Sequence, residues 1–218
     1  MDLHAPYPAL ADLHRAAKRR IPHFVWEYLD SATGLEASKA RNRTKLDEVL
    51  MMPSVLHGEI TPDLSVGLLG HTLPLPFGIA PLGMSGLIWP NAEPILASNA
   101  AALGIPYTLS TVATRTPEDI APSLGQHGWF QFYPPRDEGI RRDMLERAKA
   151  SGFHTLVLTV DVPVASRRER QIRGGLRQPP KITPRLLAQI ALCPAWAIGI
   201  ALLGMPRMRT LDKYIDQV

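Results

Sequence analysis

Hydrophobic and polar positions along this chain change their period near residue 77. Through residues 8–50 apolar side chains recur at helical spacing, as Leu10, Leu13 and Ala17 do on one face. The pattern predicts mostly helical structure there, with a second helix at His23–Asp30 and a third at residues 38–49. Residues 52–76, interrupted by Gly and Pro, predict only short extended pieces, at residues 65–68 and His71–Leu73.

From residue 77 onward, short apolar runs alternate with helical segments. The predicted strands are residues 77–80, 106–110, 128–132 and 155–160, and the predicted helices include residues 92–103 and 138–150. The run at residues 155–160 is the most continuous and predicts a buried strand. Asn91 and Thr116 stand where helix N-caps are expected, and Gly104 where a helix ends. Strands that alternate with helices predict parallel βαβ units.

Four such strands fit either a doubly wound sheet or the first half of a (β/α)8 barrel. The residues at the strand ends favour the barrel, because Pro81, Ser110, Gln131 and Thr159 stand where its catalytic face would be. No GxGxxG follows the first strand, which disfavours a Rossmann fold. The predicted fold is therefore α/β, the first four units of a TIM barrel after an N-terminal helical extension. The predicted domains are residues 1–76, 77–182 and 183–218.

Composition narrows the class of protein. Of 218 residues, 45% are hydrophobic and 20% charged, and 24 Lys and Arg against 20 Asp and Glu give a net charge of +4. This mild excess favours anionic small molecules or an acidic membrane surface, and the absence of zinc spacing or an RNP pattern disfavours nucleic acid. A single cysteine, Cys193, rules out an intramolecular disulfide and a thiolate-rich metal site. The single cysteine and the lack of a secretory signal at the start together predict a cytoplasmic protein, and the cysteine count predicts no metal site.

The strand ends also carry the candidate chemistry. Residues 80–83 can offer backbone groups to a flat ring, since Gly83 permits close approach. Ser110 and Thr159 supply hydroxyls, and Gln131 supplies an amide that both donates and accepts. Such neutral groups suit the edge of an isoalloxazine ring. Tyr133 shares the face of Gln131 if the strand continues. The alternative is that these residues only pack or satisfy backbone groups at the strand ends.

Charged residues follow the last predicted strand. A guanidinium at Arg167 or Arg168 could bind a carboxylate through two hydrogen bonds. The alternative to a functional role for Asp161 is that its side chain caps the turn that follows it. For Arg168 we favour carboxylate binding, whereas the other arginines of this segment are expected to be solvated. Those other arginines are Arg167, Arg170, Arg173 and Arg177.

Several of these segments resemble one known family in their order along the chain. They are residues 25–28 (VWEY), 40–43 (ARNR), 79–84 (IAPLGM), 109–114 (LSTVAT), 129–133 (WFQFY), 158–163 (LTVDVP) and 167–169 (RRE). Together they resemble the FMN-dependent 2-hydroxy acid dehydrogenase/oxidase family, over about residues 8–180. One such motif would be weak, but this many in the right order identify the chain as a member.

The resemblance implies a cofactor, a reaction and residue roles. FMN would accept two electrons as an L-2-hydroxy acid of the lactate, mandelate or glycolate type becomes a 2-oxo acid. The electrons would pass to a quinone, a cytochrome or oxygen, and a homo-oligomer is left open. By position, the flavin-binding residues are Ala80, Pro81, Gly83, Ser110, Gln131 and Thr159. Tyr28 and Arg168 would bind near the substrate carboxylate, Tyr133 would bind its hydroxyl, and Asp161 would support a catalytic histidine.

The chain departs from the family in two places. Residues 31–33 (SAT) replace the usual Ser-Gly-Ala after Tyr28, which bears on the placement of that loop. The later lysine, the His-Gly-Gly-Arg segment with the catalytic base, and the phosphate-binding Gly-Arg stretch are absent. We therefore expect the first half of such an enzyme, colourless or with loosely bound FMN. The alternatives are a non-catalytic remnant that binds a membrane or partner, and a different flavin- or phosphate-using barrel enzyme.

Residues 186–205 form a segment almost free of polar side chains, and about 20 residues would suffice to span a bilayer. Pro194 interrupts it, however, and a span after the fourth strand would separate the two barrel halves. We therefore expect a segment lying in the membrane interface, with Trp196 at headgroup level and Arg207 and Arg209 outside. Membrane-associated lactate and mandelate dehydrogenases resemble the chain in carrying such an insert. This predicts peripheral contact with the inner face of the plasma membrane; the alternative is a buried helical pair packed on the barrel.

Overall fold

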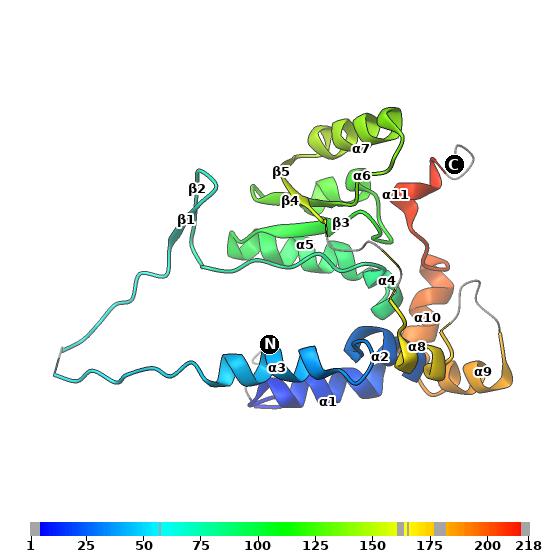
Figure 1. The fold of residues 1–218 in the computed structure, drawn as a ribbon, viewed down its shortest axis with the longest axis horizontal. Coiled ribbons are helices and arrows are strands. Elements are labelled where there is room, and N and C mark those ends of the chain that lie inside the picture. The colour runs from blue at the N-terminus through cyan, green and yellow to red at the C-terminus, as the bar shows by residue number, and fades with distance from the viewer. Residues whose placement is uncertain (1–4, 57, 161–163, 165, 177–181, 215–218) are drawn as a thin grey trace. The chain divides into compact units, whose positions relative to one another are not determined.

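The computed structural model describes residues 5–56, 58–160, 164, 166–176 and 182–214 (Figure 1). The chain divides into two compact units, which are described separately here. The first unit is Met1–Asp63 with Val164–Ala197, and the second is Leu64–Pro163 with Ile198–Val218. The sequence-based domains 1–76, 77–182 and 183–218 stay a prediction.

The first unit is helical and has its core on α2. Its elements are α1 (Leu10–Arg20), α2 (His23–Asp30), α3 (Ala37–Asp47), α8 (Glu169–Gly174) and α9 (Pro184–Ala191). Helix α2 buries Phe24, Val25 and Trp26, whereas α1 and α3 bury no residue. Helix α8 approaches α2 closely, because a Cβ on Gly174 would lie 3.1 Å from the Glu27 side chain. The predicted helices are confirmed, and α2 has the predicted bounds.

The second unit contains a parallel sheet in the order β3 (Tyr107–Ser110), β4 (Gly128–Phe132) and β5 (Phe153–Leu158). Helix α5 (Ala92–Leu103) packs beside β3, and α7 (Glu138–Ala150) beside β4 and β5 (Figure 1). The connections contain α4 (Ser85–Ile88), α6 (Pro117–Ile120) and a 3-10 turn at Ala121–Ser123, and α11 (Arg209–Asp212) follows later in the chain. Leu109, Phe130 and Met144 are fully buried between the layers. Helix α5, strand β4 and helix α7 have the predicted bounds, and Gly104 ends α5 at φ 65°.

The first predicted strand, residues 77–80, does not form a regular strand. It runs parallel to β3 but is joined to it by a single bridge between Ile79 and Tyr107. The Ile79 amide donates to the Pro106 carbonyl, and the Thr108 amide donates to the Ile79 carbonyl. Continuation would need an amide hydrogen at position 81, and Pro81 has none. The prediction of four regular strands is therefore wrong for the first strand, residues 77–80.

The prediction of a buried strand at residues 155–160 is also wrong. Strand β5 runs from Phe153 to Leu158, and its side chains alternate between covered and exposed positions. Leu156 and Leu158 are 49% and 54% exposed, because β5 is an edge strand with β4 as its neighbour on one side. A strand that carries exposed apolar side chains thus lies at an open edge of the described sheet.

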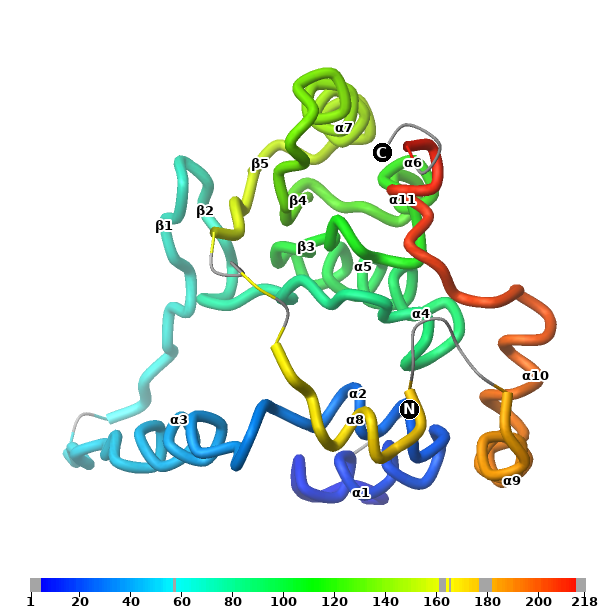
Figure 2. Tube along the Cα trace, turned by 45° about the vertical axis from the view of Figure 1, so that its right-hand side comes forward, coloured from blue at the N-terminus to red at the C-terminus, as the bar shows by residue number. Residues whose placement is uncertain are grey.

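A short antiparallel hairpin precedes the parallel sheet, as Figure 2 shows along the chain trace. Its strands are β1 (Val66–Leu68) and β2 (His71–Leu73), close to the predicted extended pieces. Leu69 and Gly70 connect them, both with positive φ (52° and 80°). Positive φ at both central residues is typical of the turns that match the twist of a two-residue hairpin.

The apolar segment forms two helices, α9 and α10 (Pro194–Leu203), bent by 103° at a short break. None of the described helices alone is long and apolar enough to cross a membrane, but the bent pair meets that test by length and composition. Leu192 and Leu202 are each 80% exposed. Trp196 is buried and stacks edge-on against Phe24, so the expectation that it lies at headgroup level is wrong.

Candidate active site

Three of the predicted site residues form a hydrogen-bonded row at the ends of the parallel strands. The Ser110 hydroxyl donates to Oε1 of Gln131 over 2.9 Å, and Nε2 of Gln131 donates to the Thr159 hydroxyl over 2.7 Å. Ser110 and Gln131 are direct partners in the β3–β4 register, and Thr159 follows β5. Because all three strands are parallel, their carboxyl ends meet at one edge and bring these neutral side chains together.

Thr111 fastens this row to the backbone, although the sequence had not singled it out. Its amide donates to the Gln131 carbonyl (3.0 Å) and to Oε1 of Gln131 (3.3 Å), and its hydroxyl donates to the same carbonyl (2.6 Å). Thr111 is 2% exposed. A hydroxyl residue directly after a strand end was the available signal, but it did not distinguish Thr111 from its neighbours.

The segment that carries Ala80, Pro81 and Gly83 lies at the same edge of the sheet. Ile79 bridges to β3, and the amide of Met84 donates to the carbonyl of Val112 in the loop after β3 (2.9 Å). Ala80 is exposed, whereas Pro81 and Gly83 are half-buried. The two loops that follow these neighbouring segments are therefore joined through their backbones.

Tyr133 lies next to this row but not within a strand. Strand β4 ends at Phe132, so the condition under which Tyr133 would share the strand face of Gln131 is not met. Its amide donates to the Thr111 hydroxyl over 3.1 Å, and the residue is 39% exposed. The backbone of Tyr133 is therefore fixed by the same threonine that fixes Gln131.

The remaining predicted residues belong elsewhere. Tyr28 is half-buried on α2, and Arg168 is exposed at the N-cap of α8; both lie in the first unit, whereas the row lies in the second. The Tyr28 carbonyl accepts a hydrogen bond from Gln171 over 3.4 Å. Asp161 lies outside the described residues.

Arg170 is the centre of a cluster of acids, so the expectation that it is solvated is wrong. Its guanidinium donates to Glu27 (2.6 and 3.1 Å), Asp30 (2.9 Å) and Glu36 (2.9 and 3.1 Å). Hydrogen bonds to Glu27 and Asp30 raise the pKa of Arg170, and burial opposes them only in part. Burial disfavours the Asp30 carboxylate, but hydrogen bonds from Arg170 and Lys39 outweigh it and lower the pKa of Asp30. The cluster ties α8, next to Arg168, to α2, which carries Tyr28.

Three histidines gather in the second unit away from the strand ends of the row. The ring of His71 lies 4.6 Å from that of His154 and 5.9 Å from that of His127, between centroids. Burial, followed by the charges of His71 and His154, lowers the pKa of His127. Nδ1 of His127 is buried without a hydrogen-bond partner. In the described part of the chain, no group of His, Cys, Asp or Glu has a geometry that could hold a metal ion.

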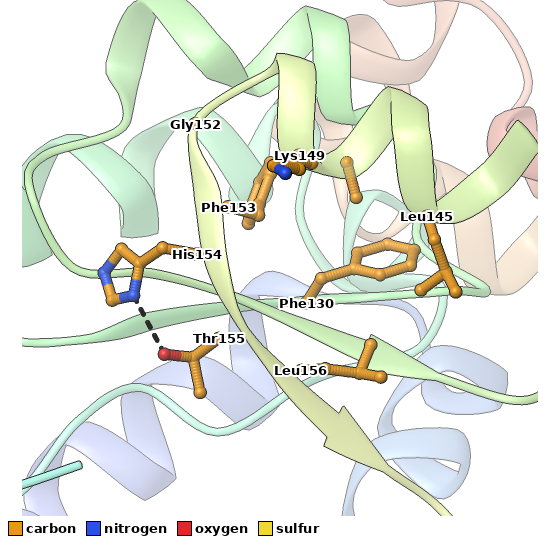
Figure 3. A pocket seen from close by; sticks show the side chains of 9 residues that line it. Phe130, Leu145, Lys149, Gly152, Phe153, His154, Thr155 and Leu156 are labelled. Atoms are coloured by element: carbon orange, nitrogen blue, oxygen red, sulfur yellow. Dashed lines mark hydrogen bonds between the residues drawn. The ribbon is translucent and has the colours of Figure 1, made fainter. Parts of the chain in front are cut away.

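A groove of about 380 Å³ runs between α7 and β5 (Figure 3). Phe130, Leu145, Phe153 and Leu156 form its apolar walls, and Lys149 and His154 lie at its margin. None of the predicted site residues lines it. The groove lies beside the open β5 edge and is separate from the row at the strand ends.

The row fits the edge of a flavin ring by its chemistry. Gln131 is 3% exposed, and its amide nitrogen carries two hydrogens, of which Thr159 accepts one. Hydroxyls at Ser110 and Thr159 can each donate and accept. Such a set of neutral groups matches a ring edge that presents both carbonyl oxygens and ring nitrogens.

Comparison with known proteins agrees with this chemistry. Residues 17–217 match the profile of the family described as FMN-dependent dehydrogenase. The L-lactate dehydrogenase of Pseudomonas aeruginosa (strain LESB58) is 38% identical over 198 residues, which cover 91% of this chain and 52% of the relative. That of Alcaligenes faecalis is 37% identical over 207 residues, covering 94% and 54%.

Solved structures give the same result. A monotopic membrane protein, (S)-mandelate dehydrogenase, superposes with a TM-score of 0.86 at 28% identity, over 95% of this chain and 58% of that one. Mandelate oxidase with benzoyl-formic acid superposes with a TM-score of 0.73 at 31% identity, over 87% and 59%.

The chain belongs to the FMN-dependent dehydrogenase family, and its sheet and helices are part of a TIM-barrel fold. The predicted family and fold class are thereby confirmed. The chain spans about half the length of the curated relatives it matches.

Proposed function

We propose that this chain supplies the flavin-binding strand ends of an enzyme that uses FMN to oxidise an L-2-hydroxy acid to a 2-oxo acid. The observation that carries the proposal is the row of Ser110, Gln131 and Thr159 across three adjacent parallel strands. The family to which the chain belongs is FMN-dependent, and its relatives are named L-lactate dehydrogenase. The substrate class proposed is that of lactate, mandelate or glycolate.

The row and the neighbouring loop would hold FMN, which supplies a two-electron acceptor when bound. Gln131 would donate to and accept from the ring edge, with Ser110 and Thr159 beside it. Ala80, Pro81 and Gly83 would contribute backbone groups. Since Thr111 already fixes Gln131, little freedom would be lost on binding, and the contribution of the protein is mainly positioning.

Three of the predicted residues would bind the substrate. Tyr133 would bind its hydroxyl, and Arg168 and Tyr28 would bind near its carboxylate, where a guanidinium can form two parallel hydrogen bonds. Asp161 would support a histidine that takes a proton. The 218 residues contain no His-Gly-Gly-Arg segment, so that histidine is not among them.

We also propose that the protein is cytoplasmic and makes peripheral contact with the inner face of the plasma membrane. The bent pair α9 and α10 exposes Leu187, Leu192, Ile198 and Leu202. Arg207 and Arg209 follow and would meet anionic headgroups. The related (S)-mandelate dehydrogenase is described as a monotopic membrane protein. A quinone in the membrane, a cytochrome or oxygen would then accept the electrons, and the proposal leaves a homo-oligomer open.

Titration of the 218-residue chain with FMN, followed by flavin fluorescence, tests the proposal. We expect weak saturable binding that Gln131→Leu reduces by about tenfold, the effect of losing one or two hydrogen bonds. The buried Met144→Ala in α7 is the matched control, which should lower stability but not FMN affinity. Equal binding by wild type and Gln131→Leu would refute the flavin role of the row.

A chimera tests the reaction. The chain is fused to the later half of the Pseudomonas aeruginosa L-lactate dehydrogenase, which supplies the missing residues. We expect a yellow protein that is bleached without oxygen by L-lactate or L-mandelate and not by the D-enantiomers. A yellow chimera that neither enantiomer bleaches would contradict the proposed substrate class.

A further inference from the structure

Glu93 is a charged residue with no exposed surface, and neither the row nor the proposed substrate contacts use it. It is the second residue of α5 and lies between the loop after residues 77–80 and the loop after β3. Burying a carboxylate is costly unless hydrogen bonds compensate for the lost water. The contacts of Glu93 therefore need an explanation.

Three donors converge on one oxygen of this carboxylate. Oε1 accepts from the Gly86 amide (3.2 Å), the Thr114 amide (2.8 Å) and the Thr114 hydroxyl (2.7 Å). Gly86 lies in the short helix α4, within the first loop, and Thr114 lies in the second loop. Oε2 is buried without a hydrogen-bond partner. One side chain thus joins both loops through a single atom.

The packing around Glu93 leaves no room for a side chain on Gly86. A Cβ there would lie 2.0 Å from the Thr114 hydroxyl oxygen and 3.3 Å from Oε2 of Glu93. Burial and then the charge of Glu93 raise the pKa of Tyr107 on β3. Both loops therefore pack tightly against the Glu93 carboxylate.

Two further contacts join the same loops. The Met84 amide donates to the Val112 carbonyl (2.9 Å), and the Arg115 guanidinium donates to the Asn91 side chain (3.1 Å). The first loop carries Pro81 and Gly83, and the second begins directly after Ser110. Any change in the spacing of the loops would therefore move flavin candidates relative to one another.

We propose that Glu93 is a positioning residue that sets the spacing of the two loops and thereby shapes the flavin-binding edge. This inference rests on the proposed function for its flavin part, but the loop spacing itself can be measured without FMN. Replacing buried ionic groups and their partners together by well-packed apolar residues is often neutral or stabilising, so stability alone does not explain the residue.

Hydrogen exchange of the full chain, followed by mass spectrometry without FMN, tests the loop spacing. Glu93→Gln keeps the shape of the side chain but removes its charge, and Thr114→Val removes one of the three donors. We expect both to speed exchange in residues 81–91 and 111–116 by roughly tenfold, as loss of a charge-assisted hydrogen bond predicts. Thr114→Ser should restore wild-type exchange, because it retains the hydroxyl.

Met144→Ala is the control for a general loss of stability. It lies in α7, is 1% exposed, and should speed exchange around α7 without singling out the two loops. If Glu93→Gln speeds exchange evenly over the second unit, or leaves the loops unchanged, the positioning role is overturned.

FMN titration then separates this inference from the proposed function. We expect Glu93→Gln to raise the FMN dissociation constant roughly tenfold, and Met144→Ala to leave it unchanged. FMN affinity equal to wild type in Glu93→Gln would refute the role toward the flavin, even if the loops loosen. If wild type binds no FMN, the proposed function fails, while the exchange data still decide whether Glu93 spaces the loops.

Discussion

The hydrogen bond between Ser110 and Gln131 predicts a measurable coupling between the two side chains. Gln131→Leu keeps a similar volume but leaves the Ser110 hydroxyl, in a residue only 4% exposed, without its acceptor. A buried polar group left without a partner costs about 1–3 kcal/mol. Half-buried Thr159 can turn to water, so we expect the lower part of this range, about 1–2 kcal/mol of unfolding free energy.

Ser110→Ala should cost about 1–2 kcal/mol, because Oε1 of Gln131 retains the Thr111 amide but the Val112 amide loses the Ser110 hydroxyl as its acceptor (3.3 Å). In the double variant no orphaned hydroxyl remains, so the loss should be smaller than the sum of the two by about 1 kcal/mol. Urea unfolding, followed by tryptophan fluorescence and circular dichroism together, measures all four proteins. A double variant that equals the sum within about 0.5 kcal/mol would refute the direct contact.

Three further predictions concern parts of the chain outside the row. The pKa of His127 is lowered below its usual 6.5, so the folded state resists protonation and the urea midpoint should fall as pH drops below about 6.5. His127→Gln should flatten this fall, and an unchanged dependence of the midpoint on pH would contradict the role given to His127. Arg170→Met should lower the melting temperature by several degrees, whereas Arg173→Met, at an exposed position, should not, because in the described part of the chain Arg170 and not Arg173 faces three carboxylates. Equal effects of the two substitutions in calorimetry would count against the cluster. Leu158→Lys on the open β5 edge should reduce self-association in analytical ultracentrifugation at little cost in stability, and an unchanged mass distribution would argue against the edge as its cause.

Local signals were enough to predict most elements of this fold. Asn91 precedes α5, but its side chain makes no cap hydrogen bond there. Helix α5 ends at Gly104, in the left-handed region, and α6 starts directly after Thr116, whose hydroxyl caps the Asp119 amide. These residues act within a few positions of themselves, so the sequence pattern contains their effect. Burial of β5 could not be predicted in this way, because it depends on which strand lies beside it.

The candidate site was predictable only where the chain direction determines it. Parallel strands bring their carboxyl ends to one edge, which sufficed to group Ser110, Gln131 and Thr159. Glu93 and Arg170 were missed because their partners are remote: Thr114 lies 21 residues from Glu93, and Glu27 lies 143 residues from Arg170. A carboxylate in a first helical turn looks like an ordinary exposed residue until its tertiary contacts are known.

The charge distribution of the first unit bears on which arginine could bind an acid. Arg170 faces three carboxylates, which more than neutralise its charge and occupy both of its terminal nitrogens. An anionic substrate would have to displace those carboxylates, so Arg170 is a poor ligand for it. Arg168 has no ion pair among the described residues and lies exposed two positions away, at the start of the same helix. By tying that helix to α2, Arg170 restricts where Arg168 can reach. Because Arg168 has no ion pair among the described residues, its charge is available for the proposed substrate carboxylate.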